Sequence, residues 1–269
     1  MSRPSGPSHL TVPGRFNGPP TSANGGFTAG LMATALLDAH AGSAGQHGTS
    51  SSGEDVPTVQ VTLRRPPPLD VALVLSASDG EMTAGDVEGA VAVARRVEAT
   101  AAGVALDPVD PGTATAAGLR FGGLTDHPFP TCFVCGTRRV EHDGLEVFPG
   151  PFTGADGSPV ESACAAVYVA TRDHTEARVG TGVSGDIGAE IVWALLDCPG
   201  GWATGFPGRP AVLGRLTARV PSVPTVGERC VVVGRFDGRE RRKSFTRTTA
   251  YGADGRELGR ASAVWIDLP

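Results

Sequence analysis

The chain has 269 residues, with 23 basic and 28 acidic side chains, a formal net charge of −5 and 40% hydrophobic residues. This length suits one large domain or two of medium size, and the apolar fraction is typical of a globular protein. The acidic balance argues against sequence-independent binding to nucleic acid, which requires a basic face.

The sequence predicts neither a membrane span nor a secretion signal. The best apolar stretch, residues 30–37, ends at Asp38 and is far shorter than the roughly 20 residues that cross a bilayer. Residues 1–10, MSRPSGPSHL, lack the hydrophobic core of a signal peptide. The 5 cysteines are an odd number spread over a long chain, which favours a reducing compartment over a disulfide framework. We therefore expect a cytoplasmic protein.

The first predicted element is a buried helix over residues 23–39. A Gly-rich turn, residues 24–26, opens it, and the segment is apolar on most faces, as in helices enclosed by other elements. Residues 1–8 ahead of it are expected to be disordered. Residues 42–55, GSAGQHGTSSSGED, predict a flexible loop because they are rich in Ser and Gly.

Antiparallel strands are predicted to surround the helices. Asp-Gly pairs, the strongest short hairpin signal, lie among runs with high strand propensity. The pairs are Asp79-Gly80, Asp156-Gly157, Asp237-Gly238 and Asp254-Gly255. The runs are Val71–Leu75, Ala163–Val169, Cys230–Val233, Phe245–Tyr251 and Ala261–Ile266. Helices wrapped by such meanders indicate an α+β fold.

The second half of the chain has the same order of elements. Residues 107–126 contain scattered Pro, Gly and Ala and are predicted to link two units, residues 9–106 and 127–269. A second Gly-containing turn, residues 184–186, precedes a second apolar helix predicted over residues 185–196. Each unit is thus expected to place one buried helix against a meander.

Two pairs of similar segments indicate an internal duplication. Residues 35–44 read ALLDAHAGSA, and residues 194–203 read ALLDCPGGWA. Further along, VTLRRP at 61–66 is similar to LTARVP at 216–221. The pairs occur in the same order and at nearly the same spacing, as expected for a repeated unit.

Three segments resemble a known family. SANGGFTAGLMATALLD resembles the Gly-Gly opening of the central helix in acyl-CoA thioesterases, and TCFVCGTRRVEHDGLEVFPGP resembles the strand that begins many small thioesterase-superfamily domains. VWALLDCPGGWA resembles a helix end in actinobacterial thioesterase-like proteins. The chain is therefore similar to the double hot-dog acyl-CoA thioesterase-like superfamily. This resemblance implies two antiparallel sheets, each wrapped around a long central helix.

The same resemblance implies a site between the two units. There the N-terminus of a central helix polarises a thioester carbonyl while a carboxylate or amide activates water. Unpaired N–H groups at a helix N-terminus suit an oxyanion, and Gly25 and Gly26 leave room for its approach. Asn24, just before them, is a candidate for orienting water or holding the carbonyl; its alternative role is a helix cap or turn residue.

Two carboxylates of the second helix are further catalytic candidates. Glu190 lies in an otherwise apolar run, where burial would raise its pKa towards that of a general base. The alternative is an exposed helix edge. Asp186 is a lesser candidate, because an acidic residue at a helix start also stabilises the helix dipole without catalysis. Asp38 and Asp197 recur in both repeats, which favours a shared structural role.

The Cys132-Phe133-Val134-Cys135-Gly136 segment resembles half of a zinc knuckle. A tetrahedral site needs two more ligands, and the sequence holds no second Cys-x-x-Cys pair. His127 and His142 flank the segment at spacings that match no zinc pattern. We therefore predict small buried thiols at a strand start and no metal.

Arg239, Arg241, Arg242 and Lys243 form a basic cluster after the Asp237-Gly238 pair. Arginine suits bidentate contacts to phosphate, so Arg241, Arg242 and Lys243 are candidates for gripping coenzyme A. The alternative is a solvated hairpin tip.

The leading functional hypothesis is hydrolysis of acyl-CoA or acyl carrier protein thioesters, with no cofactor apart from the coenzyme A of the substrate. A non-catalytic acyl-CoA-binding protein is the main alternative, because no catalytic motif is complete. A hydratase or dehydratase is disfavoured, because the Asp-x-x-x-x-His motif of those enzymes is absent. Two fused units would form either a monomeric pseudo-dimer or a homodimer.

Overall fold

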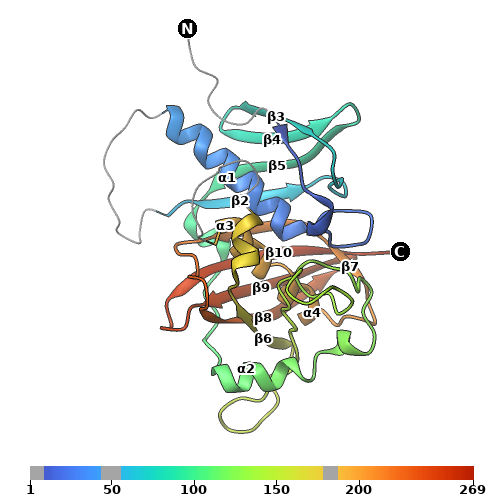
Figure 1. Ribbon diagram of the computed structural model, residues 1–269, viewed down its shortest axis with the longest axis vertical. Coiled ribbons are helices and arrows are strands. Elements are labelled where there is room, and N and C mark those ends of the chain that lie inside the picture. The colour runs from blue at the N-terminus through green and yellow to red at the C-terminus, as the bar shows by residue number, and fades with distance from the viewer. Residues whose placement is uncertain (1–8, 44–55, 178–186) are drawn as a thin grey trace.

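The computed structural model describes residues 9–43, 56–177 and 187–269 (Figure 1). The N-terminal segment expected to be disordered, most of the predicted Ser/Gly loop and the candidate Asp186 lie outside the described residues. Within the described part, no helix combines the length and the apolar character needed to cross a bilayer.

Ten strands form one continuous sheet, in the order β1-β3-β4-β5-β2-β7-β10-β9-β8-β6. Every neighbouring pair in the sheet is antiparallel. The strands are β1 (His9–Leu10), β2 (Thr58–Leu63), β3 (Leu73–Ser78), β4 (Glu81–Asp86), β5 (Gly89–Val97), β6 (Ala163–Val169), β7 (Ala211–Arg219), β8 (Arg229–Glu240), β9 (Lys243–Tyr251) and β10 (Glu257–Asp267). The expectation of two separate sheets differs from this single sheet, because hydrogen bonds between β2 and β7 join the halves.

The strand order of the first half is repeated in the second. In each half, the five strands are numbered here by their order along the chain. From the outer edge of the sheet to its centre, they lie in the order first, third, fourth, fifth, second. The two second strands, β2 and β7, meet at the centre of the sheet, where Val61 lies opposite Leu216. These residues begin the two similar segments, 61–66 and 216–221, so the sequence repeat aligns residues that are direct neighbours across the junction.

Helices pack on the sheet and on one another (Figure 1). They are α1 (Gly25–Ser43), α2 (Pro111–Gly118), α3 (Ala189–Leu195) and α4 (Cys198–Ala203), with short 3-10 turns at η1 (Gly14–Phe16), η2 (Ala99–Ala102), η3 (Gly122–Leu124) and η4 (Arg172–Ala177). Helix α1 packs against α3 and against β2, β4, β5 and β7, while α4 packs against β6, β8 and β9. Phe27, Met32 and Leu36 of α1 are fully or almost fully buried, as its apolar sequence predicts.

Glycines allow α1 and α3 to approach closely. A Cβ added at Gly30 would lie 2.5 Å from the Cα of Glu190, and one at Gly26 would lie 2.5 Å from the Cβ of Asp197. Any side chain at these two positions would therefore force the helices apart.

The second predicted helix is shorter than expected. It begins at Ala189 and ends at Leu195, whereas the prediction ran from residue 185 to 196, and α4 then begins at Cys198. Pro199 lies in the first turn of α4, where its missing N–H costs nothing; inside a longer helix it would remove a hydrogen bond. The predicted end at residue 196 is within one residue of the observed end, so the difference lies at the start, where Ile187 and Gly188 precede the helix and residues 185 and 186 lie outside the described ranges.

Two of the predicted turn features differ from the structure. Asp237-Gly238 lies within β8 at a register shift, and the β8–β9 turn is formed instead by Arg241 and Arg242. The Asp79-Gly80 and Asp254-Gly255 pairs do connect strands. Residues 107–126, expected to be loose, contain α2, which packs against β6 and β8.

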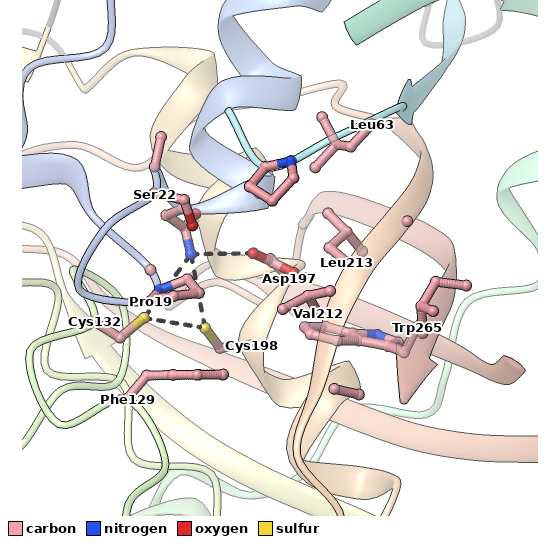
Figure 2. A pocket seen from close by; sticks show the side chains of 18 of the residues that line it. Pro19, Ser22, Leu63, Phe129, Cys132, Asp197, Cys198, Val212, Leu213 and Trp265 are labelled. Atoms are coloured by element: carbon pink, nitrogen blue, oxygen red, sulfur yellow. Dashed lines mark hydrogen bonds between the residues drawn. The ribbon is translucent and has the colours of Figure 1, made fainter. Parts of the chain in front are cut away.

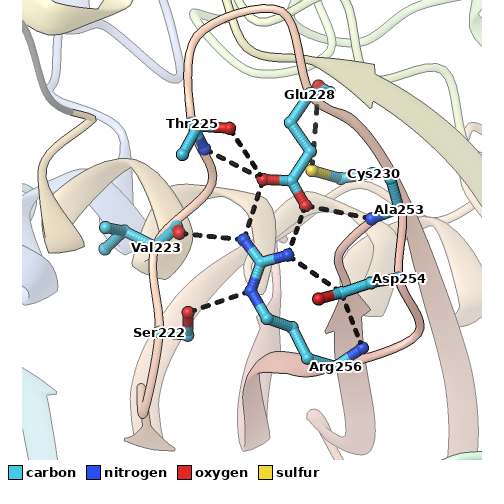
Figure 3. Close-up of polar contacts among 8 residues, drawn as sticks. All are labelled: Ser222, Val223, Thr225, Glu228, Cys230, Ala253, Asp254 and Arg256. Carbon is cyan, nitrogen blue, oxygen red and sulfur yellow. Dashed lines mark hydrogen bonds and ion pairs between the residues drawn. The ribbon is translucent and has the colours of Figure 1, made fainter.

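An ion pair fixes the loops that lead into β8 and β10 (Figure 3). Both Nη atoms of Arg256 donate to the carboxylate of Glu228, at 2.7 and 2.8 Å. The same carboxylate accepts the backbone N–H groups of Thr225 and Ala253 at 2.9 and 3.0 Å. The Arg256 hydrogen bonds lower the pKa of Glu228 to about 2, with the backbone donors acting in the same direction.

Candidate functional site

A cavity of about 420 Å³ lies beside the N-terminus of α1 (Figure 2). Its walls come from both halves of the chain and are largely apolar. The large apolar side chains in the lining are Leu63, Phe129, Trp202, Phe206, Leu213 and Trp265. A mostly apolar pocket with a few polar groups is the usual form of a small-molecule site.

Polar groups gather on the side of the cavity that faces α1. Asn24, Gly25 and Asp197 all belong to its lining. The Asn24 Nδ2 group donates to Asp197 Oδ2 at 3.1 Å, and the N–H of Gly26 donates to the same oxygen at 2.8 Å. The start of α1 therefore holds the Asp197 carboxyl in a fixed orientation.

Asn24 also caps α1. Its Oδ1 accepts the N–H of Phe27 at 2.8 Å, which is the usual contact of an N-cap residue. The structural alternative considered for Asn24 is thus realised, and the same side chain also contacts Asp197 through its other amide atom. One residue therefore both begins the helix and orients the carboxyl.

Asp197 is 2% exposed, and burial raises the pKa of its carboxyl to about 7, partly offset by the hydrogen bonds from Gly26 and Asn24. Its second oxygen, Oδ1, has no hydrogen-bond partner within the described ranges. Oδ1 is itself buried, so it is a candidate proton acceptor for a water molecule bound directly beside it at the cavity wall.

The helix start supplies an unused donor. The backbone N–H groups of Gly26 and Phe27 have acceptors, whereas Gly25, which lines the cavity, donates to no acceptor in the described part of the chain. The first N–H groups of a helix lack partners within the helix and carry partial positive charge. Gly25 is therefore positioned to donate to an oxygen inside the cavity.

Glu190, the candidate carboxylate of the second helix, lies elsewhere. It is 4% exposed, so it is not an exposed helix edge, and it packs in the first turn of α3 against Gly30 of α1. It does not belong to the cavity lining. The structure thus brings Asn24, Gly25 and Gly26 together with Asp197 rather than with Glu190.

The predicted phosphate-binding residues lie outside the cavity lining. Arg241 and Arg242 form the β8–β9 turn and Lys243 begins β9, and Arg242 donates through Nη2 to the carbonyl of Asp267 at 2.7 Å. Two other arginines, Arg64 and Arg65, do line the cavity. They follow β2, and Arg65 also pairs with the carboxylates of Asp86 and Glu88.

Asp197 is a site residue that the sequence analysis assigned to structure. The repeat aligned it with Asp38, but Asp38 is exposed on α1 whereas Asp197 is buried, so the two do not share an environment. Their local settings differ as well: Asp197 is the N-cap residue of α4, just before Cys198-Pro199, whereas Asp38 lies inside α1.

Comparison with known proteins shows which solved structures share the fold of this chain. No protein-family model and no curated protein matches the sequence. A candidate thioesterase from Novosphingobium aromaticivorans aligns with a TM-score of 0.59 at 13% identity, over 100% of both chains. A hot-dog protein of unknown function from Alicyclobacillus acidocaldarius aligns at 0.55 and 13% identity, over 97% of this chain and 92% of that chain.

The TesB protein of Mycobacterium avium subspecies paratuberculosis aligns with a TM-score of 0.54 at 11% identity, over 97% of this chain and 91% of that one. These three likenesses confirm that the chain has the hot-dog fold that the sequence resemblance implied. At such low identity they carry the fold and not the chemistry.

Proposed function

We propose that the chain is a double hot-dog protein that hydrolyses acyl thioesters of coenzyme A or of an acyl carrier protein. The repeated strand order and the pairing of Val61 with Leu216 support two fused units related by an approximate twofold axis. The units would correspond to residues 9–106 and 127–269. A monomeric or homodimeric state and a cytoplasmic location stay predictions.

The cavity suits an acyl thioester. Its apolar walls match an acyl chain, and Arg64 at its lining provides a cationic group for the phosphates of coenzyme A, whereas Arg65 already pairs with Asp86 and Glu88. One structural neighbour is a candidate thioesterase and another a TesB protein, and both share the fold of this chain, whereas the substrate class is proposed here from the cavity. Arg241, Arg242 and Lys243 lie in a turn outside the cavity, so they would contact coenzyme A only through a part of it that extends beyond the cavity.

The reaction uses groups that already converge. Asp197 takes a proton from water as the water oxygen attacks the thioester carbonyl carbon, and the N–H of Gly25 stabilises the resulting oxyanion. Collapse of the tetrahedral intermediate breaks the C–S bond. The proton then passes to the leaving thiolate, which gives a carboxylic acid and a free thiol. Asn24 is a positioning residue, because it holds Asp197 through its amide.

One observation carries this proposal: a buried carboxyl on the cavity wall, anchored through one oxygen by Gly26 and Asn24, leaves its other oxygen without a partner in the described structure. The same geometry also favours a second candidate, a non-catalytic acyl-CoA-binding protein. Asp197 already occupies the N–H of Gly26, so only Gly25 is left to stabilise an oxyanion.

Steady-state hydrolysis of acyl-CoAs of graded chain length, followed by chromatography, tests the proposal. We expect Asp197→Asn to lower kcat by at least about 100-fold, a typical contribution of a general base, with little change in the dissociation constant for acyl-CoA. Asp38→Asn is the matched control, because it alters the exposed aspartate that the repeat aligns with Asp197.

Glu190→Gln separates the two carboxylate candidates. Because Glu190 lies outside the cavity lining, we expect turnover to persist in this variant. Turnover lost on Glu190→Gln but kept on Asp197→Asn would transfer the role to Glu190. Tight acyl-CoA binding without turnover in the unmodified protein would establish the binding protein instead.

A further inference from the structure

Three cysteines from distant parts of the chain meet on the cavity wall. Cys132 and Cys135 lie on one loop and Cys198 begins α4, and all three are buried. Their sulfur atoms all lie within 4.8 Å of one another. Figure 2 shows Cys132 and Cys198 side by side. Their sulfur atoms lie 3.7 Å apart.

The loop around Cys132 and Cys135 is a tight turn. The N–H of Gly136 donates to the carbonyl of Cys132 at 2.8 Å, and a Cβ at Gly136 would lie 2.7 Å from the backbone nitrogen of Cys132. Only glycine therefore fits after the second cysteine. The Cys-x-x-Cys-Gly sequence folds here into the compact knuckle that brings two thiols to one point.

We propose that Cys132, Cys135 and Cys198 bind a zinc ion through three thiolates, with the fourth position left to water or a solute in the cavity. A tetrahedral zinc ion with Zn–S bonds of about 2.3 Å holds its sulfur ligands about 3.8 Å apart. The 3.7 Å separation of Cys132 and Cys198 already matches this spacing. The Cys135 sulfur lies within 4.8 Å of the other two, so a small shift completes the set.

A ring N–H group lies beside the cluster. Trp202 donates through Nε1 to the Cys135 sulfur at 3.5 Å. Such N–H donors orient metal-bound thiolates and offset their charge.

Asn24 links the cluster to the carboxyl site. Its Nδ2 group lies 3.9 Å from the sulfur atoms of both Cys132 and Cys198. His127 is nearby but is not available as a ligand, because its Nδ1 accepts the N–H of Phe129 and its Nε2 contacts the carbonyl of Cys135 at 3.0 Å. The protein ligands of an ion at this point would therefore all be sulfur atoms, which favours a thiophilic ion such as zinc.

Metal content of the full-length protein tests the site. The protein is expressed without a histidine tag in zinc-supplemented medium, purified under reducing conditions without chelator and analysed by mass spectrometry of the elements. We expect about one zinc ion per chain. Reconstitution of the metal-free protein with cobalt should give thiolate-to-metal charge transfer and the intense visible bands of a tetrahedral site.

Serine substitutions identify the ligands. Cys132→Ser, Cys135→Ser and Cys198→Ser should each weaken zinc affinity by at least about tenfold. Cys164→Ser and Cys230→Ser are the matched controls, because both residues are buried cysteines outside the cluster, and they should keep the metal. Circular dichroism of each variant separates loss of metal from loss of the fold.

Two results would overturn the zinc site. One is a reduced, folded protein that takes up neither zinc nor cobalt and presents all of its cysteines as free thiols after unfolding. The other is a native disulfide among the three cysteines, found by peptide mass spectrometry of protein alkylated before lysis. Neither measurement uses a substrate, so the outcome does not depend on whether the chain hydrolyses thioesters.

Discussion

Glu228 connects the loops before β8 and β10 through its carboxylate. Its side chain is 8% exposed and accepts hydrogen bonds from Arg256, Thr225 and Ala253 (Figure 3). A buried carboxylate with this many donors is stabilised in its charged form. Losing that charge leaves Arg256 without its main partner, and the loops before β8 and β10 lose their connection.

The free energy of unfolding should therefore depend on pH through Glu228. Its folded pKa, about 2, is below the ordinary value of 4.5, so the stabilisation is complete above about pH 5 and is lost as the pH falls towards 2. The contribution is on the order of 2–3 kcal/mol. Urea unfolding from about pH 2 to about pH 7 measures this loss of stability.

Glu228→Gln should lower stability at neutral pH and flatten the acid limb of this profile. The matched control is Glu161→Gln, which changes an exposed carboxylate and should leave the profile as it is. If the free energy of unfolding falls equally with decreasing pH in Glu228→Gln and in the unmodified protein, Glu228 does not provide the pH dependence.

At the scale of elements, the crossing of α1 and α3 rests on glycine. Gly30→Ala places a Cβ 2.5 Å from the Cα of Glu190 and 3.0 Å from the Cβ of Trp193. Overpacking of this kind costs about 1–3 kcal/mol, because two helices and the sheet below them must separate. Thermal and urea unfolding should show the loss, with the tryptophan spectrum reporting the altered α3.

Gly118→Ala is the control for this substitution. Gly118 ends α2, and the nearest atom to its added Cβ is the carbonyl oxygen of Phe148 at 3.5 Å, an ordinary contact. This variant should be as stable as the unmodified protein or more stable by up to about 1 kcal/mol. Equal stability of the Gly30→Ala and Gly118→Ala variants would mean that α1 and α3 do not pack as described.

The pattern of apolar and turn residues predicted helices and strands correctly where the local sequence alone determines them. Strand β6 matches the run Ala163–Val169, and α1 occupies most of its predicted range. The second helix was predicted to start too early, because the apolar residue Ile187 extends the helical pattern, whereas Gly188 is the N-cap residue and α3 begins at Ala189. The β8–β9 turn was assigned to Asp237-Gly238, which forms a bulge inside β8, whereas Arg241 and Arg242 form the turn, in agreement with the hairpin-tip alternative for the basic cluster.

The candidate site was predictable only in part. Asn24, Gly25 and Gly26 are adjacent, so a helix-start site could be inferred from the sequence. Asp197 and Cys198 join them through the packing of the second half on the first, and no local spacing encodes that contact. Cys198 was not predicted to join Cys132 and Cys135 for the same reason.

At the scale of the whole molecule, the two halves share one sheet and one core. Val61 and Leu216 lie opposite each other at the β2–β7 junction, and neither side chain is exposed. The main cluster of buried apolar residues extends from Leu10 to Trp265 and includes both helices of the α1–α3 crossing. Unfolding one half would therefore expose apolar surface of the other half and break the β2–β7 hydrogen bonds.

We therefore expect the 269 residues to unfold in one cooperative transition, although chains of this size often do not. The three tryptophans, Trp193, Trp202 and Trp265, all lie in the second half, so their fluorescence reports that half, whereas far-ultraviolet circular dichroism reports both. Leu216→Ala should lower stability by about 2–5 kcal/mol and shift both signals together.

Val61→Ala is the decisive variant, because it removes buried methyl groups from the half that contains no tryptophan. If the sheet couples the halves, the fluorescence midpoint moves with the circular dichroism midpoint, by an amount that corresponds to about 1–2 kcal/mol. Val87→Ala, which alters a fully exposed side chain, should move neither. An unchanged fluorescence midpoint in Val61→Ala would show that the halves unfold separately. The β2–β7 junction would then join two units that fold independently.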